Sequence, residues 1–286
     1  MNDIGLDAPI GNVEAWSGKT SGDENFPVGS HLIARHVRPH MHAYYGFARN
    51  ADDIADAPDL APEDKVARLD IMEDVLLGKR LDGSPSATKL RWSLHETGVT
   101  PVHATDLLVA FRQDATQRRY ETFDELYHYC RYSAVPVGRY VIDLHGEGHG
   151  SYGASDALCI ALQILNHLQD CGTDMRTLDR CYLPQTLMRH FGVTPRDLLG
   201  PAETPAMRRV FTTVLDRVNR LNLAAQELPD LVRSRRLRAE TMFICRLAMR
   251  LADRLGKADP LAQRVALTKA DGGLSLLRAI GALVWR

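Results

Sequence analysis

The stretch that decides the fold reads SDALCIALQILNHLQDCGTD and spans residues 155–174. Ser155 is a residue type that often caps the N-terminus of a helix. Apolar residues then recur in steps of three and four, which is the spacing of one helical face. They are Leu158, Leu162, Leu165 and Leu168. The stretch therefore predicts an amphipathic helix that begins after Ser155.

A second, polar stripe runs along the same predicted helix. Its members are Gln163, Asn166, Asp170 and Asp174, spaced three, four and four apart, so they share one helical face. The remaining residues of the helix are largely apolar. Polar groups buried among apolar ones need partners or a ligand. The stripe is therefore a candidate binding face.

A cluster of acidic residues, DDIAD, occupies residues 52–56. Asp52 and Asp56 are four apart and lie on one helical face, with Asp53 beside them. Arg49 precedes Asp52 by three residues, and Tyr45 precedes Arg49 by four, so both join that face. Alone, such a cluster is usually a solvated helix end. The cluster becomes a candidate metal site because the chain also contains the polar stripe at residues 163–174.

The placement of both clusters favours a bound cation. Asp56 precedes Ala-Pro and Asp170 precedes Cys-Gly, so we expect both near helix C-termini. An acid there opposes the helix dipole at roughly 0.3–1 kcal/mol, and like charges four apart add about 0.2–0.5 kcal/mol. Mg²⁺ relieves this, because it favours one or two carboxylates plus phosphate oxygens. Two such clusters facing each other predict a diphosphate site with bridging metal ions.

Helix signals continue through the rest of the chain, with almost no alternating strand pattern. We predict helices from Pro39 to just before Pro58, from Thr100-Pro101 to about Arg118, from the capping box Thr122–Glu125 to about His145, and from Thr204-Pro205 onward, with joints at Pro229 and Pro260. The expected fold is all-α: a loose arm over residues 1–20 and one helical bundle-like domain over 21–286.

The composition of the chain excludes several classes of protein. The net charge is −1, so no global field attracts nucleic acid. Apolar residues make up 45%, yet the longest apolar runs are too short to span a bilayer, and no N-terminal signal is seen. The five cysteines form no CxxC pair, which favours free thiols in a reducing compartment. A cytoplasmic enzyme is the default expectation.

Three further patterns carry weaker signals. The glycines at 148, 150 and 153 match GxGxxG, but a helix is expected before them, so we interpret the run as a loop. Histidines 36, 40, 42, 145 and 149 include helical spacings but no convincing third zinc ligand. The arginine-rich segment 233–254 is interpreted as a solvated helix face, with contact to an anionic membrane surface as the alternative.

At these residues the chain resembles the squalene and phytoene synthase family, the head-to-head prenyl synthases. The pattern from Tyr45 to Asp56 looks like the family's first motif, and Gln163 to Asp174 looks like its second. Arg180-Cys-Tyr182-Leu-Pro is similar to a third. Further matches are Tyr129, the run Ser133–Gly138 and Phe26-Pro27, and the resemblance spans about Asp23 to Leu277.

The resemblance implies an isoprenoid synthase fold, a helical bundle with a central cavity. Within the family the chain most resembles bacterial hydroxysqualene synthases of hopanoid biosynthesis. These convert presqualene diphosphate to hydroxysqualene, releasing diphosphate and capturing water. The implied enzyme is a magnesium-dependent carbon–oxygen lyase that needs no nicotinamide cofactor. A prenyltransferase that condenses two prenyl diphosphates to presqualene diphosphate or phytoene is the alternative. A noncatalytic helical protein with salt-bridged or cation-binding acids is the second alternative.

The resemblance also implies roles for individual residues. The implied metal ligands are Asp52, Asp53, Asp56, Asn166, Asp170 and Asp174. The implied catalytic residues are Asp52, Asp56, Asp170, Asp174 and Tyr129. The implied substrate-binding residues are Phe26, Tyr45, Arg49, Ala134, Gly138, Gln163, Asn166, Arg180, Tyr182 and Arg264. Besides the prenyl diphosphate, the expected partners are a membrane surface, touched peripherally, and neighbouring enzymes of the pathway, by channelling.

The chain departs from the family pattern at three places. Gln169 stands where most relatives carry Arg, and the small-residue run of the central helix reads Ala134-Val-Pro-Val-Gly138. The lysine expected after Arg264 appears as Gly272 or Gly273, with Lys269 as its substitute. These departures argue against condensation of two substrates.

Overall fold

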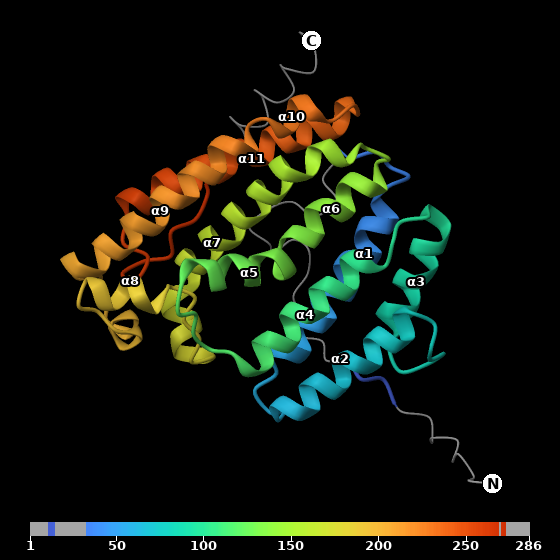
Figure 1. Ribbon diagram of the computed structural model, residues 1–286, viewed down its shortest axis with the longest axis horizontal. Coiled ribbons are helices and arrows are strands. Elements are labelled where there is room, and N and C mark those ends of the chain that lie inside the picture. The colour runs from blue at the N-terminus through green and yellow to red at the C-terminus, as the bar shows by residue number, and fades with distance from the viewer. Residues whose placement is uncertain (1–10, 15–32, 269, 273–286) are drawn as a thin grey trace.

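The computed structural model describes residues 11–14, 33–268 and 270–272 of the chain, and over them it is helical (Figure 1). The elements in chain order are α1 (Arg38–Asp56), α2 (Pro62–Leu76), α3 (Pro85–Thr97), α4 (Val102–Thr116), α5 (Phe123–Ser133), α6 (Val135–Leu144), the 3₁₀ helix η1 (His149–Ser151), α7 (Tyr152–Thr177), α8 (Gln185–His190), η2 (Pro195–Leu199), α9 (Pro205–Ala225), α10 (Leu228–Leu231) and α11 (Arg235–Lys257). The all-α prediction is confirmed.

Several helix ends lie where the capping residues place them. The Thr122 side chain accepts a hydrogen bond from the backbone N–H of Glu125 at 3.2 Å, which opens α5. Thr204 does the same for Met207 at 3.1 Å and opens α9. Helix α1 ends at Asp56, before Pro58, as the sequence predicts. Side-chain caps of this kind satisfy donors that a helix start leaves open.

The predicted single helix from Thr122 to His145 is wrong. The chain breaks at Ala134, which has φ −128° and ψ −44°, into α5 and α6. Pro136 explains the break, because it lacks an N–H and its ring clashes with the carbonyl four residues earlier. The run Ala134–Gly138 is therefore a helix junction.

The long helix α7 also differs from its predicted limits. It begins at Tyr152, after the turn η1, so Ser155 is a buried interior residue and not a cap. Asp170 is not near the helix end, because α7 continues through Gly172 to Thr177. A Cβ at Gly172 would lie 3.2 Å from the Leu261 side chain and 3.3 Å from the Leu198 carbonyl oxygen. Gly172 thus permits close packing.

Part of the predicted loose arm is anchored. Val13 is buried, and its backbone N–H donates to the Gly83 carbonyl at 2.9 Å. The Glu14 carboxylate accepts from the Ser84 and Ser86 side chains at 2.6 Å each, at the start of α3. This segment is anchored because the apolar Val13 side chain packs at the α2–α3 connection and the Glu14 carboxylate caps the N-terminus of α3. The rest of residues 1–20 lies outside the described residues, and the domain boundary stays a prediction.

The helices form two packed groups that are joined through α6 and through the contact of α4 with α5. Helix α7 lies in the middle of one group and packs against α5, α6, α9 and α11, whereas α1 to α4 pack on one another in the other group (Figure 1). Val141 on α6 packs against the hydrophobic cores of both groups. The acidic cluster on α1 and the polar stripe on α7 thus belong to different groups.

Close approach of α6 and α7 depends on Gly138. A Cβ there would lie 2.5 Å from Ser155 Oγ and 2.6 Å from Cys159 Sγ. We expect Gly138→Ala to lower the free energy of unfolding by about 1–3 kcal/mol, since neighbouring groups must shift. Gly46→Ala on α1 is the control, because nothing lies within 4 Å of its Cβ and alanine favours a helix. Urea denaturation checks both, and equal stabilities would contradict this packing.

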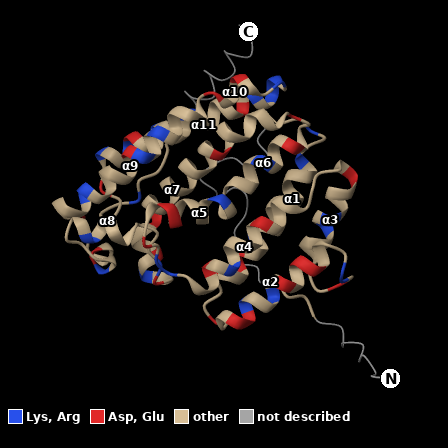
Figure 2. Ribbon diagram, in the orientation of Figure 1, with Lys and Arg blue, Asp and Glu red and all other residues tan. Residues whose placement is uncertain are grey.

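The structure shows where the glycine-rich run and the arginine-rich segment lie. The GxGxxG run follows helix α6, not a strand, which argues against a dinucleotide fold. The loop interpretation holds only for Gly148, because Gly150 lies in η1 and Gly153 lies in α7. Within the arginine-rich segment, Arg238 donates to the Pro229 and Val232 carbonyls, and Arg250 and Arg254 pair with Asp271. Basic and acidic positions are interspersed along the helices (Figure 2). Among the helices that the structure describes, none combines the length and apolarity needed to cross a bilayer.

Candidate diphosphate and metal site

Helix α1 contributes an arginine held between two carboxylates. The Arg49 guanidinium lies 3.1 Å from Asp52 and 2.7 Å from Asp53. Asp53 is buried, whereas the Asp52 side chain is 35% exposed. Arg49 therefore positions both acids along the helix, and Asp52 has the freer face toward a ligand.

Helix α7 contributes the polar stripe that the sequence predicts. The Gln163 Nε2 lies 3.2 Å from His167 Nε2, and Asn166, Asp170 and Asp174 follow at helical spacing. Gln169 points elsewhere: it is buried and its amide donates to the Val265 carbonyl at 2.6 Å. Gln169, which stands where most relatives carry Arg, thus holds the segment after α11 against α7.

The two acidic clusters face each other. Burial raises the pKa of Asp174 to about 7, the Asp170 carboxylate adds to this, and Asp56 on α1 raises it further. The pKa of Asp52 is also raised, first by burial and then by Asp56. Carboxylates raise one another's pKa in this way only when they lie close together. The C-terminal parts of α1 and α7 therefore lie near enough for Asp56 and Asp174 to interact electrostatically.

Arg180 bridges the two helix groups within this site. Its guanidinium lies 3.0 Å from Asp56 on α1 and donates to the backbone carbonyl of Asp114 on α4 at 3.0 Å. It also donates to the Tyr182 hydroxyl at 3.2 Å. The Arg180 side chain is 8% exposed. Because it is already committed to these partners, Arg180 acts first as a support for Asp56.

Asp114 is a member of the site that the sequence reasoning missed. Its carboxylate accepts from the Tyr129 hydroxyl at 2.8 Å and from the Tyr182 hydroxyl at 3.3 Å, and it lies 3.8 Å from Arg180. Burial raises its pKa to about 6 although Arg180 opposes the shift. The available signal was an acid in line with Leu107 and other apolar residues of α4. The Tyr129 hydroxyl is therefore held by Asp114.

His167 is a second residue that the sequence reasoning missed. Its ring stacks on that of Tyr182, with centroids 3.5 Å apart and planes at 14°. Burial lowers its pKa to about 3, so the imidazole is neutral near pH 7. Tyr120 and Tyr129 pack against Tyr182 and complete an aromatic cluster under the site. The cluster gives the acidic residues a rigid, apolar support.

An apolar cavity of about 250 Å³ is lined in part by α1 and α7, the two helices that carry the acidic clusters. Tyr45 and Ala48 line it from α1 directly before Arg49, and Leu162 lines it from α7 directly before Gln163. The acidic residues thus follow the cavity residues on both helices. The complete lining is Ile33, Met41, Tyr44, Tyr45, Ala48, Val137, Gly138, Val141, Ile142, Ser155, Leu158, Cys159, Leu162, Leu228, Leu237, Glu240, Thr241 and Ile244.

Three predicted substrate-binding residues are not placed at the site. Ala134 is buried at the α5–α6 junction and does not line the cavity, because the break at Pro136 turns the chain there. Arg264 is exposed, although its neighbour Val265 is bonded to Gln169. Phe26 lies outside the described residues, as does Lys269.

The side chains at the site are oxygen donors of the kind that magnesium binds. Six carboxylates, those of Asp52, Asp53, Asp56, Asp114, Asp170 and Asp174, meet the guanidinium groups of Arg49 and Arg180. Lys65 adds a nearby cation, and burial lowers its pKa. Burial is the main reason that the pKa values of Asp52, Asp114 and Asp174 are raised, and neighbouring carboxylates add to it. Within the described ranges, no group of three or more His, Cys, Asp or Glu side chains is arranged so that these side chains alone could hold a metal ion. Mg²⁺ is commonly held by one or two carboxylates, water and phosphate oxygens.

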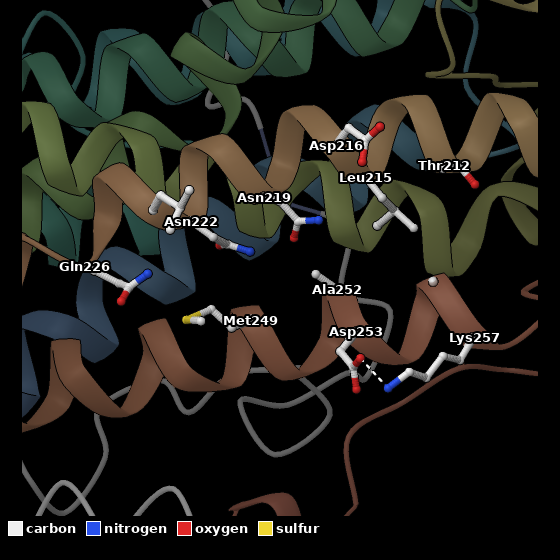
Figure 3. A pocket seen from close by; sticks show the side chains of 12 residues that line it. Thr212, Leu215, Asp216, Asn219, Asn222, Gln226, Met249, Ala252, Asp253 and Lys257 are labelled. Carbon is white, nitrogen blue, oxygen red and sulfur yellow. Dashed lines mark ion pairs between the residues drawn. The ribbon is translucent and has the colours of Figure 1, made fainter.

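A second hollow, of about 510 Å³, lies between α9 and α11 (Figure 3). Asn219 and Asn222 line it from α9, and the ion pair of Asp253 with Lys257 borders it on α11. Asn222 is buried, and its amide has no hydrogen-bond partner among the described residues. Of the predicted site residues that the structure describes, none lines this groove, so it is separate from the candidate site.

Comparison with known proteins places the chain in a family. Residues 19–271 match the model of the squalene/phytoene synthase family. A hydroxysqualene synthase from Rhodopseudomonas palustris is 46% identical over 89% of this chain and 87% of its own length. A hydroxysqualene synthase from Zymomonas mobilis is 42% identical over 93% of this chain and 91% of its own.

A solved structure shows the same architecture. The squalene synthase HpnC from Alicyclobacillus acidocaldarius superposes with a TM-score of 0.70 at 30% identity, over 79% of this chain and 85% of that one. The match in sequence and in fold therefore runs through both acidic helices. The chain belongs to the squalene/phytoene synthase family.

Proposed function

We propose that this chain is a hydroxysqualene synthase. It ionises presqualene diphosphate, allows the carbon skeleton to rearrange, and captures water to give hydroxysqualene and diphosphate. The observation that carries the proposal is the meeting of α1 and α7 carboxylates beside an apolar cavity. The relatives from Rhodopseudomonas palustris and Zymomonas mobilis, which bear that name, support the choice of reaction.

The proposed chemistry begins with the leaving group. Mg²⁺, when bound, supplies Lewis-acid stabilisation of the charge that collects on the diphosphate oxygens. Asp52, Asp56, Asp170 and Asp174 would hold it, with Asn166 and Asp53 as further oxygen donors. The planar guanidinium of Arg49 contacts the Asp52 carboxylate and would add contacts to phosphate oxygens. Preorganised charge of this kind is usually the largest catalytic contribution.

The apolar cavity serves the cation that ionisation leaves behind. Its walls, formed mainly by aliphatic and aromatic side chains, would shield the part of the substrate that enters it from bulk water. The Tyr45 side chain lines the cavity and would stabilise the cation through its ring, because aromatic faces attract cations. Gln163, which is hydrogen-bonded to His167, would orient phosphate or metal-bound water through its amide. Tyr182 and Tyr129 act through Asp114, as positioning residues.

The proposed class is a carbon–oxygen lyase, not a condensing transferase, with magnesium as cofactor and no nicotinamide requirement. Asp114, Tyr129 and Arg180 support either reaction, so product identity separates them. Peripheral contact with an anionic membrane and channelling with neighbouring pathway enzymes stay predictions, as do a cytoplasmic location and the absence of nucleic-acid binding.

Product analysis tests the proposal. Purified protein with presqualene diphosphate and Mg²⁺ is expected to form hydroxysqualene and release one diphosphate per turnover, with NADPH neither needed nor consumed. Chelation with EDTA abolishes the reaction, and added Mg²⁺ restores it. Farnesyl diphosphate alone gives no product. Squalene formed only with NADPH, or presqualene diphosphate formed from farnesyl diphosphate, would contradict the assignment.

A further inference from the structure

One carboxylate stands in the apolar cavity, away from the acidic site. Helix α11 presents Leu237, Glu240, Thr241 and Ile244 to the cavity, a stripe with steps of three, one and three. Glu240 is 3% exposed. It is the one Asp or Glu among the described residues that line this cavity. A buried carboxylate is costly and persists where it is paired or used.

Three other polar groups of the cavity wall are less suited to accept a proton. The Tyr44 hydroxyl donates to the His103 carbonyl at 2.9 Å, so its hydrogen points out of the cavity. The Thr241 hydroxyl donates to the Arg238 carbonyl at 3.0 Å, which leaves its oxygen able to accept. Burial raises the pKa of the Cys159 thiol to about 12, so it is no base near pH 7. Glu240 is therefore the proton acceptor that the cavity offers.

The start of α11 is fixed rigidly against the rest of the fold. The backbone N–H groups of Arg233 and Ser234 donate to the Glu147 carboxylate at 2.8 and 2.7 Å. The Ser234 side chain caps the helix through the N–H of Leu237 at 3.3 Å. These hydrogen bonds fix the N-terminus of α11 and therefore the position of Glu240 on that helix. A residue that directs a water molecule needs such a fixed position.

We propose that Glu240 positions the water that ends the reaction and accepts its proton. This inference rests on the proposed function and adds a catalytic residue to it. The water oxygen forms a bond to the cationic carbon, one O–H bond of the water breaks, and its proton passes to the Glu240 carboxylate. Thr241 and Ser155 supply further polar atoms on the same wall, and an internal water needs two to four of them. Cavity walls that are otherwise apolar keep competing water away.

The test separates ionisation from water capture in one assay. Wild type, Glu240→Gln and Glu240→Asp are incubated with presqualene diphosphate, Mg²⁺ and H₂¹⁸O, and both diphosphate and labelled hydroxysqualene are measured. In Glu240→Gln, diphosphate release stays within about threefold of wild type, because its charge is stabilised elsewhere. Hydroxysqualene per diphosphate released falls roughly tenfold or more, as expected for loss of a positioned base. Products of elimination replace it.

Controls make each outcome decisive. Glu240→Asp keeps a carboxylate and is expected to retain more water capture than Glu240→Gln. The exposed Glu227→Gln leaves both measurements unchanged, and melting curves confirm that all variants fold. An unchanged product ratio in folded Glu240→Gln overturns the inference, and so does a loss of diphosphate release with the ratio intact. If wild type itself forms no hydroxysqualene, the proposed function fails instead.

Discussion

Replacing Asp170 with Asn is expected to lower turnover of presqualene diphosphate by roughly 10³-fold or more and to leave the fold intact. The loss follows because one of the carboxylates that hold charge at the leaving group is removed. Stability is preserved because Asp170 repels Asp174 in the folded protein and raises its pKa. An amide of the same shape relieves that repulsion. The measurement is steady-state diphosphate release at saturating Mg²⁺, together with a melting curve.

Asp216→Asn is the matched control for this variant. Asp216 lies on α9 in the groove next to Asn219, away from the acidic site (Figure 3). The same chemical change there is expected to leave turnover unchanged. Wild-type turnover in Asp170→Asn at saturating Mg²⁺ would remove Asp170 from the metal site.

Replacing Arg180 with Met is expected to lower the free energy of unfolding by about 3–5 kcal/mol, the usual effect of removing one partner from a buried ion pair. Asp114, whose side chain is 6% exposed, would lose its guanidinium partner. Asp56 would also lose its contact, so turnover falls as well. Urea denaturation measures the stability change.

A double-mutant cycle identifies the cause. Adding Asp114→Asn to Arg180→Met removes the unpaired charge, so the double variant is expected to lose less stability than the two single variants together. Arg189→Met, which breaks an exposed ion pair with Glu121, is the control and should change stability little. Strict additivity at Arg180 and Asp114 would show that the two residues are not coupled.

The fold was largely predictable from the sequence because its signals are local. Thr122, Thr204 and Pro58 mark helix ends through hydrogen bonds or steric exclusion within a few residues. The wrong helix boundaries occur where contacts between residues far apart in the sequence determine the structure. Gly172 looked like a helix end, but it is a contact point for Leu261. Pro136 was overlooked as a break within a strong apolar pattern.

The site was predictable only in part. Helical spacing groups Asp52 with Asp56 and Asp170 with Asp174, but it does not state that the two pairs meet. Asp114 belongs to the site because α4 packs between α1 and α5, and its own helix reads as ordinary core. Glu240 sits in an arginine-rich segment whose exposed face dominates the sequence pattern. Buried polar residues on otherwise apolar helices are the signal that both cases share.

The most direct test is a crystal structure of the protein with Mn²⁺, in place of Mg²⁺, and an unreactive thio-analogue of the prenyl diphosphate. The anomalous signal of manganese marks each ion. The account predicts ions between the diphosphate and the carboxylates of both α1 and α7, with the prenyl chain in the apolar cavity. Manganese bound elsewhere, with Asp52, Asp56, Asp170 and Asp174 directed into bulk solvent around a bound analogue, would contradict it.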